Sequence, residues 1–119
     1  MYMLMLVLNN PEYLDEVLLA VESAGVSGST ILESTGINRR RLQRQVGAPF
    51  MAGINRLTGS TEENHYTIFS IVRDEEQVSV CIRAVEKVVG NLDDPDTGVA
   101  AAWPLSIVKG VKGQNGGEE

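Results

Sequence analysis

The order of apolar and amphipathic segments constrains the fold more than any other feature of the sequence. An apolar run over residues 3–8 is followed by apolar residues at helical spacing over 14–24 and, after a turn, by a short stretch over 29–35 that contains Ile31 and Leu32. The same order returns later, with an apolar run over 64–73 and helical spacing over 78–89, before the last short runs of the chain. Runs of this length suit strands and are too short for helices. The sequence therefore predicts the order strand, helix, strand twice.

Both predicted helices carry a start and a stop signal. Asn10 is a favoured N-cap residue and precedes a proline at the first helical position, where the missing N–H is not needed. Gly25 ends this helix, because glycine readily adopts the backbone conformation found after a helix C-terminus. Asp74 caps the second helix, with Gln77 three residues on as its capping-box partner, and Gly90 ends it.

Two strand–helix–strand units fit the ferredoxin-like, or split βαβ, arrangement of the α+β class. In this fold four strands form an antiparallel sheet, and both helices pack on one of its faces. We also expect a short extra C-terminal strand over 106–111, after Pro104. Residues 1–112 then form a single domain that contains a long segment at 36–63, and residues 113–119 form a flexible polar tail.

The predicted strands are apolar on both sides. A sheet face in contact with water shows a regular alternation of apolar and polar residues, which the run over 3–8 lacks. The face that the helices leave open therefore needs a cover, and the simplest cover is another copy of the chain. The sequence predicts a homo-oligomer.

Length and cysteine content limit the class of protein. The 119 residues include one cysteine, so the chain has no disulfide framework, which favours a reducing, cytoplasmic setting. No run approaches the roughly 18 consecutive apolar residues that a membrane-spanning helix needs. The run over 3–8 lacks the basic flank and the length of a signal peptide. We therefore expect a cytoplasmic protein.

Charge is distributed unevenly along the chain. The net charge is −6, yet five of the ten basic residues fall within 36–61, a stretch without any acidic residue. The rest of the chain therefore carries −11. An acidic body with one cationic segment argues against a nucleic-acid-binding protein, which needs a broad basic face. It favours a local site for an anion, or an acidic protein partner.

The cationic segment holds a short repeat. The sequence GINR at 36–39 recurs at 53–56, and glycine and asparagine tolerate the positive φ angles of turns that converge backbone N–H groups. An arginine after such a turn suits a phosphate or a carboxylate. Apolar residues are mixed with the arginines, which is typical of a segment that orders against a partner. The alternative is a loop that packs onto its own oligomer.

Catalytic and metal-binding chemistry find little support. Cys81 lies on the apolar side of the second helix, where a buried, inert thiol is the usual case. His65 is the only histidine, and no second histidine or nearby cysteine gives it a zinc-type spacing. The acidic turn at 93–98 lacks the ligand pattern of a calcium loop. The sequence therefore predicts no enzyme, no catalytic residue, no metal site and no covalently bound cofactor.

Two stretches resemble the PII (nitrogen regulatory protein P-II) signal-transduction family. The first covers residues 8–36, where Pro11 opens a helix and the motif GVSGST at 25–30 leads into a strand. The second, looser stretch includes WPL at 103–105 and the closing residues 109–113. This resemblance implies a ferredoxin-like trimer with its sheets packed around the axis and an adenine nucleotide bound between subunits. It also implies a role in nitrogen regulation.

The resemblance implies a partner and a set of ligand-binding residues. Residues 36–63 match the family's T-loop, which docks onto membrane transporters, channels or enzymes. The implied ligand-site residues come from the second strand, the base of the long segment, a late turn and the last basic residues of the chain. They are Gly28, Ser29 and Thr30 (beside adenine and ribose), Gly36, Asn38, Arg39 and Arg40 (near the phosphates), Gly98 (in the family's second ligand-binding turn), and Lys109 and Lys112 (basic residues of the last strand).

The chain departs from the family's pattern at two places. The turn before Gly98 holds aspartates, where the family has glycines and a closing lysine, and Arg40 replaces the family's glutamine. The resemblance is therefore to a divergent, PII-like member with a preference for a less charged nucleotide or another anion. One rival is a trimeric divalent-metal-binding protein resembling the CutA family, which shares the topology. Another is a structural oligomer that binds no ligand.

Overall fold

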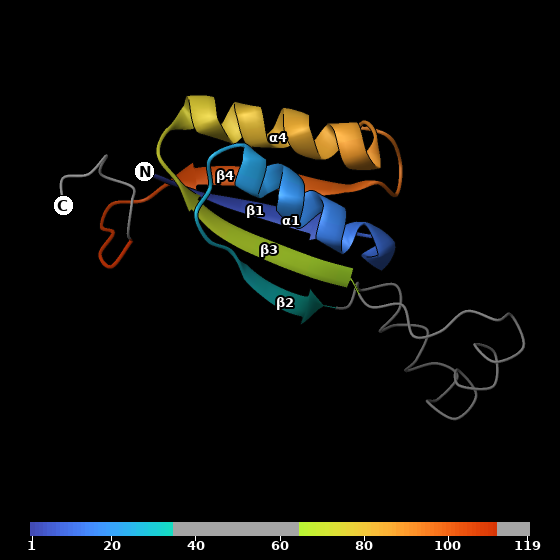
Figure 1. The fold of residues 1–119 in the computed structure, drawn as a ribbon, viewed down its shortest axis with the longest axis horizontal. Helices are drawn as coiled ribbons and strands as arrows, with labels where there is room; N and C mark the ends of the chain where they lie inside the picture. The colour runs from blue at the N-terminus through green and yellow to red at the C-terminus, as the bar shows by residue number, and fades with distance from the viewer. Residues whose placement is uncertain (35–64, 112–119) are drawn as a thin grey trace, which may run out of the picture.

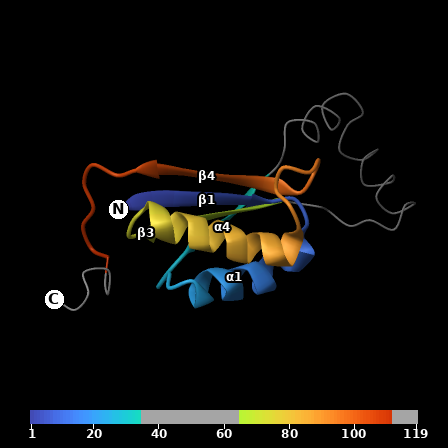
Figure 2. The same cartoon turned by 90° about the horizontal axis from the view of Figure 1, so that it is seen from above.

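Four strands form one antiparallel sheet, and two helices cover one of its faces (Figures 1 and 2). The structure is a computed structural model that describes residues 1–34 and 65–111. The strand order is β2-β3-β1-β4. The elements are β1 (Tyr2–Leu8), a 3-10 turn η1 (Pro11–Tyr13), α1 (Leu14–Ser23), β2 (Thr30–Ser34), β3 (His65–Val72), α4 (Glu75–Val89) and β4 (Gly98–Pro104). This is the predicted ferredoxin-like α+β fold.

The predicted start signals act at α4 and at η1, the 3-10 turn that leads into α1, whereas α1 itself begins at Leu14 without a side-chain cap. The Oδ1 atom of Asn10 accepts a hydrogen bond from the backbone N–H of Glu12 at 3.0 Å, at the start of η1. The Oδ1 atom of Asp74 accepts one from the backbone N–H of Gln77 at 2.8 Å. Each bond satisfies a donor that the helix itself leaves unpaired. Gly25 and Gly90 follow the two helices with φ angles of +98° and +97°.

The core lies between the sheet and the helices. Alternate residues of β1 point toward α1 and α4, because successive side chains of a strand face opposite sides. The buried apolar residues are Leu4, Leu6 and Leu8 of β1, Val17 and Val21 of α1, Val26, Ile68 and Val72 of β3, and Val78, Cys81 and Val85 of α4.

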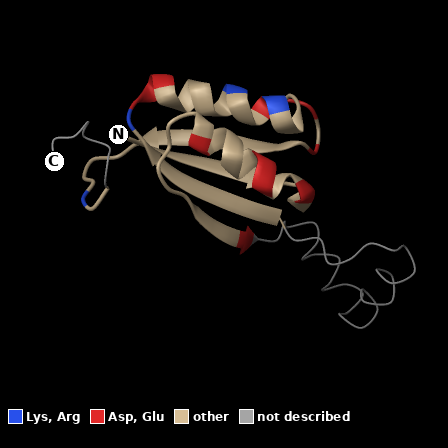
Figure 3. Ribbon diagram, viewed as in Figure 1, with Lys and Arg blue, Asp and Glu red and all other residues tan. Residues whose placement is uncertain are grey.

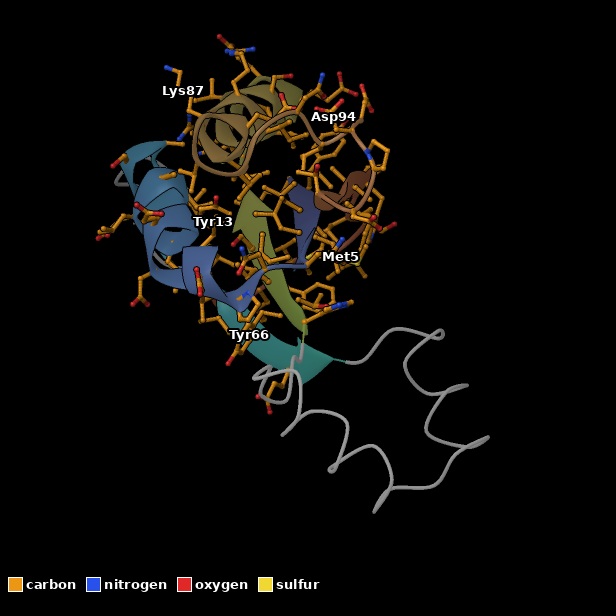
Figure 4. The ribbon with its side chains drawn as sticks, turned by 90° about the vertical axis from the view of Figure 1, so that its right-hand side faces the viewer. Met5, Tyr13, Tyr66, Lys87 and Asp94 are labelled. Carbon is orange, nitrogen blue, oxygen red and sulfur yellow. The ribbon has the colours of Figure 1, made fainter. Side chains whose placement is uncertain are left out.

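The other face of the sheet, which we call the outer face, is also apolar. Directly opposed residues of an antiparallel pair share a face, and the register places Met5 between Phe69 and Ala101. Met3 lies in the same way between Ile71 and Trp103. Figure 4 shows Met5 and Tyr13 on opposite sides of the sheet, with Tyr13 on the side of α1. The prediction that the strands are apolar on both sides is therefore confirmed.

The predicted extra strand over 106–111 is wrong. The backbone N–H of Leu105 still donates to the carbonyl of Met1 at 2.9 Å, but the structure has no strand among residues 105–111. Pro104 closes β4, an edge strand, and a proline has no N–H to continue a ladder. Gly110 then adopts a φ of +90°, which interrupts extended backbone. Apolar residues in this stretch therefore do not indicate a strand.

Charged residues lie mainly on the helices and turns. Figure 3 shows the four strands almost free of them, with an acidic residue at the end of β2. That residue is Glu33. Within residues 1–34 and 65–111, neither helix combines the length and the apolar character that crossing a bilayer requires.

Candidate ligand-binding site

A groove of about 490 Å³ opens where β2 begins. Its polar side is formed by residues 27–30, which are the end of the segment that joins α1 to β2 and the first residue of β2. Its apolar side comes from β1, β3 and the end of the described chain. The residues that line it are Met3, Ser27, Gly28, Ser29, Thr30, Phe69, Ile71, Gly110 and Val111.

The groove lies on the outer face of the sheet. Thr30 pairs with Phe69, and Phe69 pairs with Met5, so these three residues share that face. Apolar side chains beside hydroxyl groups and exposed backbone can accommodate a flat, partly polar ligand. A second copy of the chain that covered the outer face would also border the groove.

The structure brings three of the sequence-predicted residues together in this groove. They are Gly28, Ser29 and Thr30, which all line it. The Oγ atom of Ser29 lies 2.6 Å from the Oγ atom of Ser70, a hydrogen bond in which either can donate. A Cβ atom added at Gly28 would meet no atom within 4 Å, so space for a side chain remains there. Their role as ligand-binding residues stays a prediction.

Lys109 lies next to this groove in the sequence. It is exposed and directly precedes Gly110, which with Val111 lines the groove. The other predicted residues at the base of the long segment and after the last strand fall outside the described residues. They are Gly36, Asn38, Arg39, Arg40 and Lys112, together with the whole segment 36–63 and the tail 113–119.

Gly98 lies away from the groove within one chain. It pairs with Leu8 at the end of β1, whereas the groove contains Met3 near the start of that strand. Five residues of a strand span roughly 16 Å. A Cβ atom added at Gly98 would lie 2.5 Å from the carbonyl oxygen of Val7, and the φ of Gly98 is +149°. The close approach of β4 to β1 therefore requires glycine at this position.

The acidic turn before Gly98 is held by hydrogen bonds to its own backbone. Asn91 accepts two of them, from the N–H of Asp93 to its Oδ1 atom at 2.9 Å and from the N–H of Asp94 to its carbonyl at 3.0 Å. The Oε2 atom of Glu86 accepts a third from the N–H of Leu92 at 3.0 Å. Among the described residues, no group of three histidine, cysteine or acidic side chains could hold a metal ion.

The only cysteine is buried in the core. Burial raises the pKa of the Cys81 thiol, and the charge of Arg73 opposes this rise to a lesser degree. The thiolate is the nucleophilic form, so a raised pKa disfavours reactivity. The expected buried position of this thiol is confirmed.

Sequence reasoning missed the apolar half of the groove. Met3, Phe69, Ile71 and Val111 come from three separate parts of the chain, and only the strand register brings them together. The one available signal was that the strands are apolar on both sides. It indicated an outer surface that needs a cover, but it could not locate a groove on it.

The fold places the chain in the class of ferredoxin-like α+β proteins. No protein-family model matches the sequence, and no curated protein matches it either. Among solved structures 136 chains match. One of them is the crystal structure of a proposed PII-like signaling protein from Thermus thermophilus. It is 15% identical, the match covers 86% of this chain and 82% of that one, and the TM-score is 0.50. At this identity the likeness establishes a shared fold.

Proposed function

We propose that this chain is a divergent PII-like signaling protein of the cytoplasm, without enzymatic activity of its own. In this proposal it forms a homotrimer, binds a small anionic effector, most simply an adenine nucleotide, between subunits, and regulates a partner protein through residues 36–63. The partner is a membrane transporter or an enzyme, and the process is nitrogen regulation. The observation that carries the proposal is the groove at Gly28, Ser29 and Thr30, on a fold shared with a PII-like signaling protein.

The outer face supports association between copies. Val99 and Trp103 of β4 and Leu32 of β2 keep 53%, 41% and 52% of their surface exposed, although all three are large and apolar. Contiguous exposed apolar surface of this kind marks an interaction site, because its removal from water is favourable by about 25 cal/mol per Å². Packing of sheet against sheet covers it.

The division of the predicted ligand residues supports a site shared between subunits. Within one chain Gly28 and Gly98 lie at different ends and edges of the sheet. Two copies that meet at their outer faces can bring the groove of one toward the turn of the other. A ligand held by both copies stabilises their association, so ligand binding and assembly are coupled.

The charge distribution supports an anionic effector. Outside residues 36–61 the chain carries five basic and sixteen acidic residues, so its body repels anions. The five arginines of 36–61 are half of its basic residues, and no acidic residue lies among them. An effector that bears phosphate is attracted to that segment, and an arginine can hold it by two parallel hydrogen bonds.

A thermal-shift panel tests the proposal. ATP, ADP, AMP, cyclic nucleotides, bicarbonate and 2-oxoglutarate are added separately to the full chain. A ligand that binds only the native state raises the unfolding midpoint, and we expect at least one adenine nucleotide to do so. Arg39→Ala is expected to remove that rise. A panel without any shift, alongside tight stoichiometric binding of copper or zinc in equilibrium dialysis, would instead support the metal-binding rival.

A further inference from the structure

Two buried polar side chains hold the same segment of the chain. Among the described residues, only Ser70 and Gln77 are both polar and buried, with 3% and 2% of their surface exposed. Each makes a hydrogen bond to the segment that joins α1 to β2, residues 24–29, which we call the connector. Figure 1 shows the connector passing from α1 to β2 at the end of the molecule where α4 begins.

Gln77 holds the start of the connector. Its Nε2 atom donates to the carbonyl of Ala24 at 3.3 Å, and its Oε1 atom accepts from the backbone N–H of Arg73 at 2.7 Å. The side chain therefore ties the end of α1 to the turn before α4. A buried amide is stable only with its partners present, and replacing it with an apolar side chain removes the bond that each backbone group makes to it.

Ser70 holds the end of the connector. It lies on the helix side of β3, and its Oγ atom bonds the Oγ atom of Ser29 at 2.6 Å. Between the two anchors Val26 is buried, and its N–H donates to the carbonyl of Val21 at 3.3 Å. Ser27 and Gly28 are exposed and line the groove.

The start of the connector is also confined by shape. Gly25 has a φ of +98°, and a Cβ atom added there would lie 3.0 Å from the Nε2 atom of Gln77. Glycine at this position lets the chain turn close against the buried amide. The connector thus leaves α1 in one direction, and its residues 27–29 line the groove before β2 begins.

We propose that Gln77 and Ser70 are positioning residues, which hold the connector in the conformation that forms the polar side of the groove. A preformed site binds more tightly, because the ligand does not have to order the backbone. The part of the inference that concerns binding rests on the proposed function. The part that concerns the connector does not.

Hydrogen exchange of the full chain without ligand tests the structural part. Gln77→Met keeps the volume of the side chain but removes both hydrogen bonds, and Ser70→Ala removes the hydroxyl. We expect the amides of residues 24–30 to exchange at least tenfold faster in each variant, with unchanged exchange in β1. Ser70→Thr keeps a hydroxyl and is expected to preserve protection.

Val85→Ala is the matched control. It truncates a buried residue on α4, eight positions beyond Gln77, and so lowers the stability of the core without removing an anchor. Faster exchange confined to the connector in Gln77→Met and Ser70→Ala, but not in Val85→Ala, supports the inference. Exchange like that of the wild type in both anchor variants, or the same connector exchange in Val85→Ala, overturns it.

Titration with ATP, ADP and AMP tests the part that concerns binding. We expect the anchor variants to bind whichever nucleotide the wild type binds at least tenfold more weakly, with Ser70→Thr close to the wild type. Wild-type affinity in variants with a loosened connector would overturn the positioning role. If the wild type binds none of the three, the choice of these nucleotides as effector fails, and hydrogen exchange alone decides the inference about the connector.

Discussion

Gly98 and Val7 approach so closely that a Cβ atom at position 98 would lie 2.5 Å from the carbonyl oxygen of Val7. Gly98 is the first residue of β4, and it pairs with Leu8 of β1. Its φ of +149° is one that residues with side chains rarely adopt. The end of the acidic turn is therefore fixed by a backbone contact as well as by strand pairing.

Gly98→Ala is expected to destabilise the protein by roughly 2–4 kcal/mol, because the methyl group meets backbone in addition to the strained φ. Two other glycines supply controls. A Cβ atom at Gly90 meets nothing within 4 Å, but φ there is +97°, so Gly90→Ala adds strain without a contact. Gly28→Ala adds neither. In urea unfolding, the loss of stability should be largest for Gly98→Ala, smaller for Gly90→Ala and smallest for Gly28→Ala. Equal losses at all three positions would contradict the account.

The outer face predicts a specific effect on assembly. Met5→Lys places a charge at the centre of this face, between Phe69 and Ala101, and is expected to dissociate the proposed oligomer because the charge would lose its hydration in the interface. Leu19→Lys changes an exposed apolar residue on α1 and serves as the control. Sedimentation velocity measures both. An oligomer unaffected by Met5→Lys would show that another surface holds the copies together.

Gly28→Trp is expected to block the groove and leave the fold intact. Because a Cβ atom at Gly28 meets no atom within 4 Å, an indole can occupy the space beside the connector. Binding of the nucleotide that stabilises the wild type should weaken at least tenfold, while the unfolding midpoint without ligand changes little. Isothermal titration calorimetry provides the measurement. Unchanged affinity would place the ligand elsewhere.

The buried thiol predicts a dependence of stability on pH. Burial raises the pKa of Cys81 in the folded state, so the folded protein holds this proton more tightly than the unfolded chain. The resulting contribution to stability is complete below the ordinary thiol pKa of about 8.5 and is lost as pH rises through the folded-state pKa. Unfolding free energies of the wild type and Cys81→Ala should therefore converge in alkaline solution. A constant difference between them would argue against a buried thiol.

Local signals in the sequence predicted the elements well. The caps at Asn10 and Asp74 and the stops at Gly25 and Gly90 depend on neighbouring backbone, so residue type alone reveals them. The strand predicted over 106–111 failed because apolar composition does not show whether a partner strand is within reach. Beyond Pro104, Leu105 still bonds Met1, just before β1, but no strand forms among residues 105–111.

The candidate site was predictable only in part. The resemblance indicated Gly28, Ser29 and Thr30, which line the groove, but the apolar half of the groove depends on strand register. The hydrogen bonds of Gln77 show the same limit of prediction from sequence. Its bond to Asp74 spans three residues and follows from sequence spacing, whereas its bond to Ala24 spans 53 residues and follows from the packing of α4 against α1. Contacts of the second kind require the assembled fold.

Native mass spectrometry of the full chain, in parallel with ATP, ADP and AMP, tests the central claim most directly. It reports in one spectrum how many chains associate and how many nucleotides they hold. The account predicts a trimer that takes up to three copies of at least one nucleotide. A single chain that remains free of all three nucleotides would contradict it.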